Sequence, residues 1–283
     1  MSTLLTVGLS TGFYSLLHLV SEKLIVPRFD QEIVSKLSKN DRIDLAEKFP
    51  SCVNSLLVGL FSFYLVFIAR VFDNDIFTHY PPALDVLFAG LLGYTIYDSF
   101  VMFMKTNEEP TIWIHHIVVG FGCIMEMYYR QAAFFPTIFC VTEITVIPTN
   151  LVWYLQRLQM KDTKLYTMAL IARAAAFVLI RLPIAPFVFW YAIDNQGLIP
   201  INTVVSGMAA ATTTNNTLLA VSGLHIKEKI STFVVKFTDL PWIVSLSCTF
   251  NILALGFLNT AWTVVIVGNL SSYLRRKHHE KQI

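Results

Sequence analysis

Charged residues are scarce in this chain of 283 residues. Only 14% are Asp, Glu, Lys or Arg, while 55% are hydrophobic. A soluble domain typically carries about 25% charged residues, with which it covers its core. So few charges and a mean hydropathy of +0.59 exclude an ordinary soluble domain. We therefore expect lipid to surround most of the molecule.

Cysteine is also rare, and basic residues form no stripe among the aromatic ones. The four cysteines are far apart in apolar runs, without the spacing of metal ligands: Cys52, Cys123, Cys140 and Cys248. This pattern favours free buried thiols and argues against a disulfide framework and a metal site. The net charge of +2 gives no reason to expect a nucleic-acid partner.

The chain contains seven apolar runs long enough to be membrane-spanning helices, each of which needs roughly 20 residues. They are expected at about 3–20, 50–72, 83–104, 111–130, 133–157, 165–192 and 248–274. The first run lacks a preceding basic stretch and a small-residue cleavage motif, which favours a retained helix over a removed signal peptide. Residues 21–49 are rich in charge and predict a solvated loop with a short surface helix. The sequence therefore predicts an all-α, polytopic membrane bundle.

The segment 194–240 leaves the number of spans open. Its part 198–224 is long enough to cross a membrane but rich in Thr, Asn and Gly. An eighth helix, a re-entrant piece and an extramembrane insertion all fit. The basic tail Arg275-Arg276-Lys277 favours a cytoplasmic C-terminus, and the sequon Asn215-Asn216-Thr217 suits a luminal insertion. We favour seven spans, with a luminal N-terminus and a cytoplasmic loop after the first span.

Seven ionisable residues fall inside the apolar runs. They are Asp98, His115, His116, Glu126, Glu143, Arg173 and Arg181. A charge at the centre of a bilayer costs at least ~2.5 kcal/mol, so such residues usually face the bundle interior and have a partner. These seven residues are therefore the candidate functional residues.

Asp98 and the adjacent histidines lie at matching depths on two successive spans joined by a short connection. An Asp–His contact is therefore expected, and Tyr94, one turn from Asp98, can join it. A carboxylate that orients an imidazole prepares it for general-base or nucleophilic catalysis; equally, the pair could only hold two helices together. Since adjacent histidines point about 100° apart on a helix, His115 and His116 do not suit a zinc chelate.

Glu143 and Arg181 lie at similar depths on the fifth and sixth spans, which predicts a buried structural ion pair. Arg173 is a candidate ligand-binding residue for an anionic head group, or it extends to the interface. Glu126 is expected as a boundary residue near the luminal end of its span. Proline kinks in the fifth and sixth spans are expected to open a polar-lined cavity; they fall at Pro136, Pro148, Pro183 and Pro186.

Five segments follow one another on successive spans: Gly93-Tyr94-Thr95-Ile96-Tyr97-Asp98; Trp113-Ile114-His115-His116; Glu143-Ile144-Thr145 with Pro148, Asn150 and Trp153; Arg181 with Pro183 and Pro186; and Asn259 with Trp262. In content and order these motifs resemble the TLC-domain superfamily of endoplasmic-reticulum membrane proteins. Asn54-Ser55-Leu56-Leu57-Val58-Gly59 is similar to the start of the family's second helix. The resemblance implies a first helix and cytoplasmic loop at 1–44, a TLC-like domain at 45–274 with an insertion at about 194–240, and a cytoplasmic tail at 275–283.

The chain is more similar to the small TLC domain-containing proteins than to the ceramide synthases. It has Val119 where the synthases have Thr after the histidine pair, and Glu143 and Thr145 where they have paired aspartates. The resemblance implies lipid homeostasis in the endoplasmic reticulum through binding of membrane lipids or fatty-acyl chains. The alternative is an N-acyltransferase that uses Asp98 and a histidine, with acyl-CoA as co-substrate and a sphingoid base as acceptor.

The remaining expectations concern transport, cofactors and partners. A transporter is the least favoured function, because no internal repeat is visible. No bound cofactor and no nucleic acid are expected. The chain could assemble with itself or another protein within the membrane.

Overall fold

A computed structural model describes residues 3–73, 75–106, 108–194 and 215–280. Within those residues the chain is helical and contains no strand. Seven helical runs are long and apolar enough to cross a membrane: Thr3–Arg28, Lys39–Ile68, Ala83–Met104, Pro110–Tyr129, Phe134–Arg157, Lys164–Asp194 and Trp242–His279. The predicted all-α polytopic bundle of about seven spans is thus confirmed.

Several runs consist of more than one helix. The α-helices are α1 Thr3–Val20, α2 Gln31–Lys36, α3 Lys39–Phe63, α4 Ala83–Met104, α5 Pro110–Tyr129, α6 Phe134–Cys140, α7 Val146–Arg157, α8 Lys164–Ala176, α9 Ile184–Asp194, α11 Asn215–Thr238 and α12 Trp242–Glu280. The π and 3-10 turns are η1 Ser21–Ile25, η2 Val26–Arg28, η3 Tyr64–Ile68, η4 Val141–Thr145 and η5 Phe177–Arg181. In the fifth run η4 lies between Pro136 and Pro148, and in the sixth run η5 ends two residues before Pro183. The regular hydrogen-bond ladder is hard to continue near proline.

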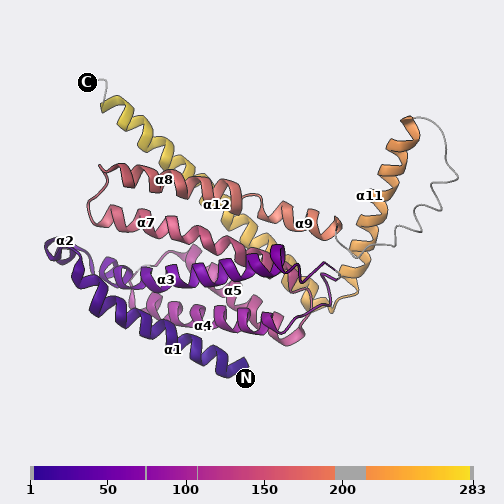
Figure 1. Cartoon of the computed structure of the whole chain (residues 1–283), viewed down its shortest axis with the longest axis horizontal. Coiled ribbons are helices and arrows are strands. Elements are labelled where there is room, and N and C mark those ends of the chain that lie inside the picture. The colour runs from indigo at the N-terminus through magenta and orange to yellow at the C-terminus, as the bar shows by residue number, and fades with distance from the viewer. Residues whose placement is uncertain (1–2, 74, 107, 195–214, 281–283) are drawn as a thin grey trace.

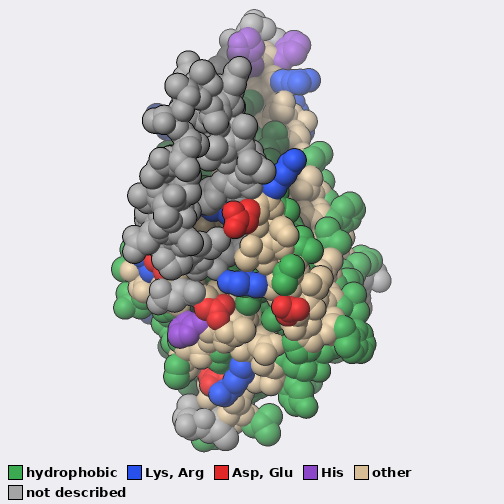
Figure 2. Space-filling view, turned by 90° about the vertical axis from the view of Figure 1, so that its right-hand side faces the viewer, with side chains coloured by type: hydrophobic (Ala, Val, Ile, Leu, Met, Phe, Trp, Pro, Cys, Tyr) green, Lys and Arg blue, Asp and Glu red, His purple; other side chains and the backbone are tan. Residues whose placement is uncertain are grey.

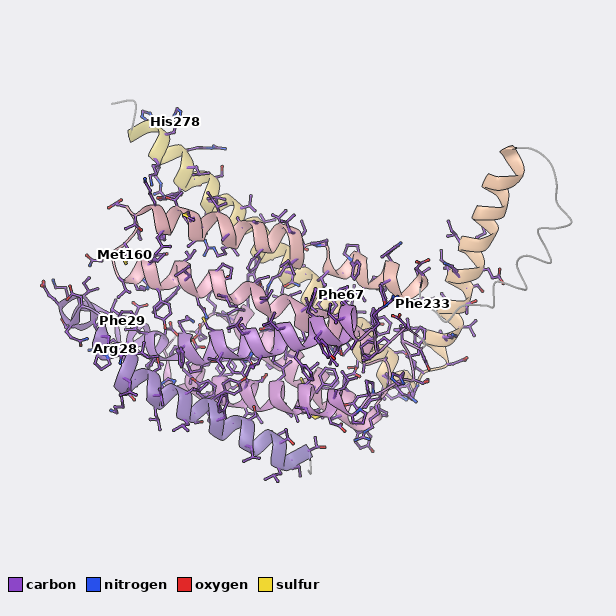
Figure 3. The ribbon with its side chains drawn as sticks, viewed as in Figure 1. Arg28, Phe29, Phe67, Met160, Phe233 and His278 are labelled. Atoms are coloured by element: carbon purple, nitrogen blue, oxygen red, sulfur yellow. The ribbon has the colours of Figure 1, made fainter. Side chains whose placement is uncertain are left out.

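Most of the helices run along the long axis of the molecule, while α11 stands steeply at one end (Figure 1), so the molecule has two distinct ends. We call them the α2 end, where α2, the α7–α8 connection and the C-terminus lie, and the α11 end. Arg28, Phe29 and Met160 mark the α2 end, while Phe67 and Phe233 lie toward the α11 end (Figure 3). Figure 2 views the molecule from the α11 end and shows Asp, Glu, Lys and Arg side chains spread over this face, with hydrophobic side chains beside them.

Large hydrophobic side chains also cover the outside of the helices. Phe103 is 74% exposed, Leu179 72% and Phe257 73%. In water such a surface would be unfavourable at roughly 25 cal/mol per Å² of apolar area. It is suited to contact with lipid chains, as the composition predicts.

The second span starts earlier than expected. The charge-rich sequence predicts a solvated loop up to residue 49, but α3 begins at Lys39, where the Ser38 side chain accepts a hydrogen bond from the Asp41 backbone N–H at 3.0 Å. Hydropathy does not detect this first part because it is polar. Ion pairs of Asp41 with Arg157 and of Asp44 with Lys105 attach it to neighbouring helices instead.

The segment that leaves the span number open is only partly described. Residues 198–214 lie outside the described residues, and the remainder of 198–224 begins α11. The sequon at 215–217 is at the start of this helix. α11 is not among the seven runs long and apolar enough to span a membrane.

α1 packs closely against α4 at Gly93. The Thr11 hydroxyl donates to the Gly93 carbonyl at 3.0 Å, and the Ser10 hydroxyl donates to the Gly90 carbonyl at 2.7 Å. A Cβ on Gly93 would lie 2.5 Å from the Ser10 Cβ and 2.6 Å from the Val7 carbonyl oxygen. Small residues at helix interfaces permit such close packing in membranes.

Gly93→Ala is therefore expected to push α1 and α4 apart and to lower the free energy of unfolding by about 1–3 kcal/mol, the usual cost of overpacking. Gly90→Ala is the matched control, since a Cβ there meets nothing within 4 Å. Thermal unfolding in detergent compares the two variants. Equal melting temperatures for both would contradict the close approach of α1 and α4.

Candidate functional site: an internal cavity and a histidine pair

α4 and α5 are neighbouring antiparallel helices, and Asp98 meets a histidine between them. The His116 Nε2 lies 3.1 Å from Asp98 Oδ2, and both side chains are almost buried. The contact expected from depth is thus formed, with His116 as the partner. At the connection between the helices, Lys105 forms ion pairs with Asp44, at 2.8 Å, and with Glu108. Burial acts to lower the pKa of Lys105, but hydrogen bonds to the two carboxylates outweigh it and raise that pKa.

The two histidines face different surroundings. His116 lies beside an outer groove between α4 and α5, which Thr95, Phe100 and Trp113 also line. His115 instead lines an internal cavity, with its ring 5.7 Å from that of Trp262 on α12. The Nδ1 atom of each is buried without a hydrogen-bond partner among the described residues. A single turn of α5 therefore presents one imidazole outward and the other inward.

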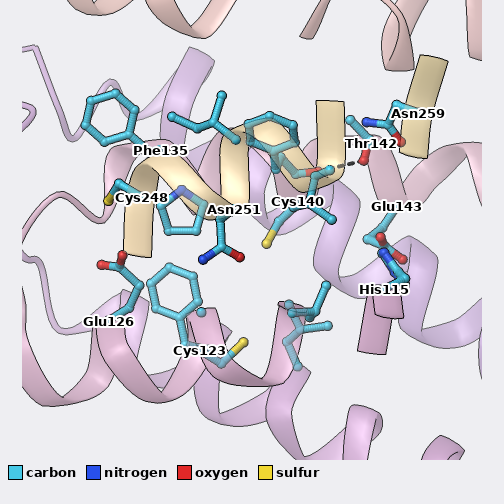
Figure 4. Close-up of a pocket in the computed structure, with 18 of the residues that line it drawn as sticks. His115, Cys123, Glu126, Phe135, Cys140, Thr142, Glu143, Cys248, Asn251 and Asn259 are labelled. Atoms are coloured by element: carbon cyan, nitrogen blue, oxygen red, sulfur yellow. Dashed lines mark hydrogen bonds between the residues drawn. The ribbon is translucent and has the colours of Figure 1, made fainter. Parts of the chain in front are cut away.

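The internal cavity lies among α4, α5, α6, η4 and α12. Its wall is mainly apolar in the middle and polar at its two ends (Figure 4). Three of the four cysteines line it from three helices: Cys123, Cys140 and Cys248. Along α5 it extends from His115 to Glu126, and along α12 from Asn259 to Cys248. Eleven residues of helix span about 16 Å at ~1.5 Å per residue, so the cavity is elongated along the bundle.

Arg181 closes the inner end of the cavity. Its Nε donates to the Thr145 hydroxyl at 2.6 Å and its Nη1 donates to the Asn259 side-chain oxygen at 3.1 Å. The guanidinium also lies over the rings of Phe177 at 4.9 Å and Trp262 at 5.6 Å. Arg181 thereby connects η4, η5 and α12.

The predicted direct ion pair between Glu143 and Arg181 is wrong. Both side chains line the cavity, but no ion pair joins them in the described part of the chain. Equal depth does not ensure contact, because the 3-10 turn η4 directs the Thr145 hydroxyl at the guanidinium instead. The charge of Arg181 is still close enough to act on Glu143.

Glu126 is the second difference from expectation. Expected as a boundary residue, its side chain is only 5% exposed and lines the cavity near the α11 end. Its Oε2 is buried and has no hydrogen-bond partner among the described residues. It faces inward because it lies eleven residues, about three turns at ~3.6 residues per turn, from His115 on the same face of α5.

Tyr94 and Arg173, the two candidate ligand-binding residues, lie outside the cavity wall. The Tyr94 hydroxyl donates to Glu47 Oε1 at 3.5 Å, and no hydrogen bond to Asp98 forms among the residues described. Arg173 is half-buried on α8, and its Nε has no hydrogen-bond partner in the described structure. It lines neither the cavity nor the outer groove.

A buried pair in α3 escapes sequence reasoning. Lys48 donates to Glu47 Oε2 at 2.9 Å, and Glu47 is only 4% exposed. The Lys48 ammonium also lies 5.6 Å from the Trp153 ring and close enough to attract Asp98. The Ser38-x-x-Asp41 pattern is a helix start signal that would have placed this pair on a helix.

No group of three His, Cys, Asp or Glu side chains is gathered for a metal ion within the described ranges. Pro136, one of the four kink-forming prolines, lines the cavity as expected. The site therefore consists of a polar inner end, an apolar middle and a single carboxyl near the other end.

The partners of Arg181 can be tested by substitution. Thr145→Val and Asn259→Leu each remove one hydrogen bond to a buried cation, and each is expected to lower the free energy of unfolding by about 1.5–3 kcal/mol. Glu143→Gln is the matched change on η4, and it is expected to cost less than half as much. Chemical unfolding in detergent measures the three changes in free energy of unfolding. A larger loss for Glu143→Gln than for the other two variants would support a direct ion pair between Glu143 and Arg181.

Comparisons with known proteins agree with this architecture. The TLC domain family matches residues 44–268. The chain is 22% identical over 173 residues to TLC domain-containing protein 4 A of Dictyostelium discoideum, covering 60% of this chain and 67% of that protein. Thr145, Arg181, Asn259 and Trp262, which carry part of the resemblance, converge in space at the inner end of the cavity. The chain belongs to the TLC domain family.

Proposed function

We propose that this membrane protein acts in lipid homeostasis by holding the hydrocarbon chain of a membrane lipid in the internal cavity. The observation that carries the proposal is the shape and lining of the cavity. Its middle is bounded by Phe88, Leu91, Val119, Ile252 and Leu255. Such an apolar wall with a few polar groups is typical of small-molecule sites.

The length of the cavity suits a lipid chain. Its lining extends about 16 Å along α5 at ~1.5 Å per residue, about half of the ~30 Å hydrocarbon thickness of a bilayer. Its volume is about 50 Å³, so a bound chain has to widen it by moving side chains of the apolar middle. The hydrocarbon chain of a lipid in one leaflet covers a similar distance. It would exchange contact with other lipid chains for contact with the cavity wall at little cost, since both are apolar.

The inner polar end is stable with or without a bound lipid. Arg181 has its own partners in Thr145 and Asn259, so the end remains intact while the cavity changes occupant. His115 Nδ1 stays available as a hydrogen-bonding group there. We propose the endoplasmic reticulum as the location of this activity, and membership in the TLC domain family supports it.

A cavity-filling variant tests the proposal. Val119→Phe places an aromatic ring in the apolar middle, where it displaces at least two methylene groups of a bound chain. At ~0.8 kcal/mol per buried methylene, we expect at least a tenfold loss of affinity. Native mass spectrometry of the protein purified in neutral detergent, titrated with hexadecanol, measures it.

Ile124→Phe is the matched control, because Ile124 lies on the same helix but is 53% exposed toward lipid. It is expected to leave binding unchanged. Equal affinities for the wild type and both variants would contradict binding in the cavity.

Acyl transfer is a second candidate function, and the Asp98–His116 contact of 3.1 Å is the observation that favours it. In such a reaction the amine nitrogen of a sphingoid base attacks the thioester carbonyl of acyl-CoA. His116 takes the proton from the amine, and the CoA thiol leaves with one. Asp98 holds the imidazole in the orientation needed and stabilises its charged form.

Microsomes supplied with labelled acyl-CoA and a sphingoid base test this function. If His116 is the base, His116→Ala lowers amide formation by at least ~100-fold, while His115→Ala, whose ring faces the cavity, has a smaller effect. Absence of amide at every chain length, or the same yield from His116→Ala as from the wild type, would exclude acyl transfer by this pair.

A further inference from the structure

Among the side chains that the structure describes, none supplies Glu126 with a counter-charge. Glu126 is 5% exposed, lines the cavity, and its Oε2 has no partner among the described residues. Asn251 and Cys248 of α12 line the same part of the cavity but bring no charge. A buried carboxyl in this position must either be protonated or be neutralised by a cation from outside.

The nearest basic residue along the chain is engaged elsewhere. Arg130 forms an ion pair with Asp85 at 2.9 Å and lies over the Tyr80 ring at 5.4 Å. Residues 195–214, which the structure does not describe, contain no Lys, Arg or His, and His225 is the one basic residue among 215–225, whose side chains are likewise not described. Glu143, by contrast, lies within the influence of Arg181 and His116.

The position of Glu126 adds to its attraction for a cation. It lies in the last turn of α5, which ends at Tyr129. The C-terminal end of a helix carries partial negative charge, which favours a cation nearby. It is also the end of the span, where the head group of a lipid would lie.

Building on the proposed function, we propose that Glu126 binds the ammonium group of an amine-bearing, single-chain amphiphile, whose hydrocarbon chain extends along the cavity toward His115. The carboxylate accepts N–H hydrogen bonds from the ammonium and supplies the counter-charge. The inner end is less suited to this head group because the fixed cation Arg181 repels it.

This orientation has a chemical consequence. An ammonium at Glu126 lies about 16 Å from His115, at ~1.5 Å per residue along α5. That separation is too large for His115 to take a proton from the amine. A lipid held in this way is bound for storage or presentation, and not for N-acylation inside the cavity.

Three probes of equal chain length test the head-group preference on the full-length protein in neutral detergent: hexadecylamine, hexadecanol and hexadecanoic acid. Native mass spectrometry measures the affinity of each. We expect the amine to bind about tenfold more tightly than the alcohol, as one charge-assisted hydrogen bond implies. Hexadecanoic acid is expected to bind more weakly than either.

Glu126→Gln keeps the shape of the side chain and removes its charge. It is expected to bring the amine-to-alcohol ratio close to one while leaving the affinity for the alcohol unchanged. Glu143→Gln, the matched change at the inner end, is expected to retain the tenfold preference. Retention of binding to hexadecanol also shows that each variant is folded.

The outcomes separate this inference from the proposed function. In one outcome all three probes bind equally well, Glu126→Gln changes nothing, and Val119→Phe abolishes binding. This result would overturn the role of Glu126 and leave the proposed function in place. Loss of the preference for the amine in Glu143→Gln, and not in Glu126→Gln, would mean that the lipid binds in the opposite orientation. That result would also overturn the role of Glu126. Binding insensitive to Val119→Phe would overturn the cavity itself.

Discussion

The Arg181 guanidinium connects three of the seven helical runs inside the membrane. Its hydrogen bonds reach Thr145 in the fifth run and Asn259 in the seventh, and it stacks against Phe177 in its own run and Trp262 in the seventh. A cation at this depth is tolerated only when the protein itself satisfies it. That requirement fixes η4, η5 and α12 relative to one another, and the cavity lies directly beside the resulting cluster.

The irregular turns make this arrangement possible. A continuous α-helix would place Thr145 and Arg181 according to depth and helical phase alone. The 3-10 turn η4, between Pro136 and Pro148, and the π turn η5, just before Pro183, change that phase. Membrane helices tolerate such breaks where neighbouring groups satisfy the freed backbone, and here they also bound a cavity.

The histidine pair divides the site into an inner and an outer part. His116 and Asp98 form a buried contact beside the outer groove, whereas His115 belongs to the internal cavity. The two imidazoles therefore do not act on one common point. Binding of a chain in the cavity and any chemistry at His116 are separate properties, and variants of the two residues distinguish them.

Hydropathy and depth predicted much of this molecule, including the seven spans and the Asp98–histidine contact. Both depend on distance along the membrane normal, which residue counting measures well. Rotation about each helix axis is not measured in that way. For this reason residue counting predicts the wrong partner for Arg181 and a boundary position for Glu126. It also does not distinguish which of the two histidines contacts Asp98. Glu47 and Lys48 were missed because a polar helix start has the composition of a loop.

The most direct test of the account is where a bound chain lies. A hexadecylamine carrying a diazirine near its methyl end would be photoactivated on the protein in lipid nanodiscs, and the modified peptides identified by mass spectrometry. The account predicts labels on cavity residues near the inner end, such as His115, Val119 and Leu255, and few on the lipid-facing Phe103 and Phe257. Labels confined to those outer residues would contradict a chain-binding cavity within the bundle.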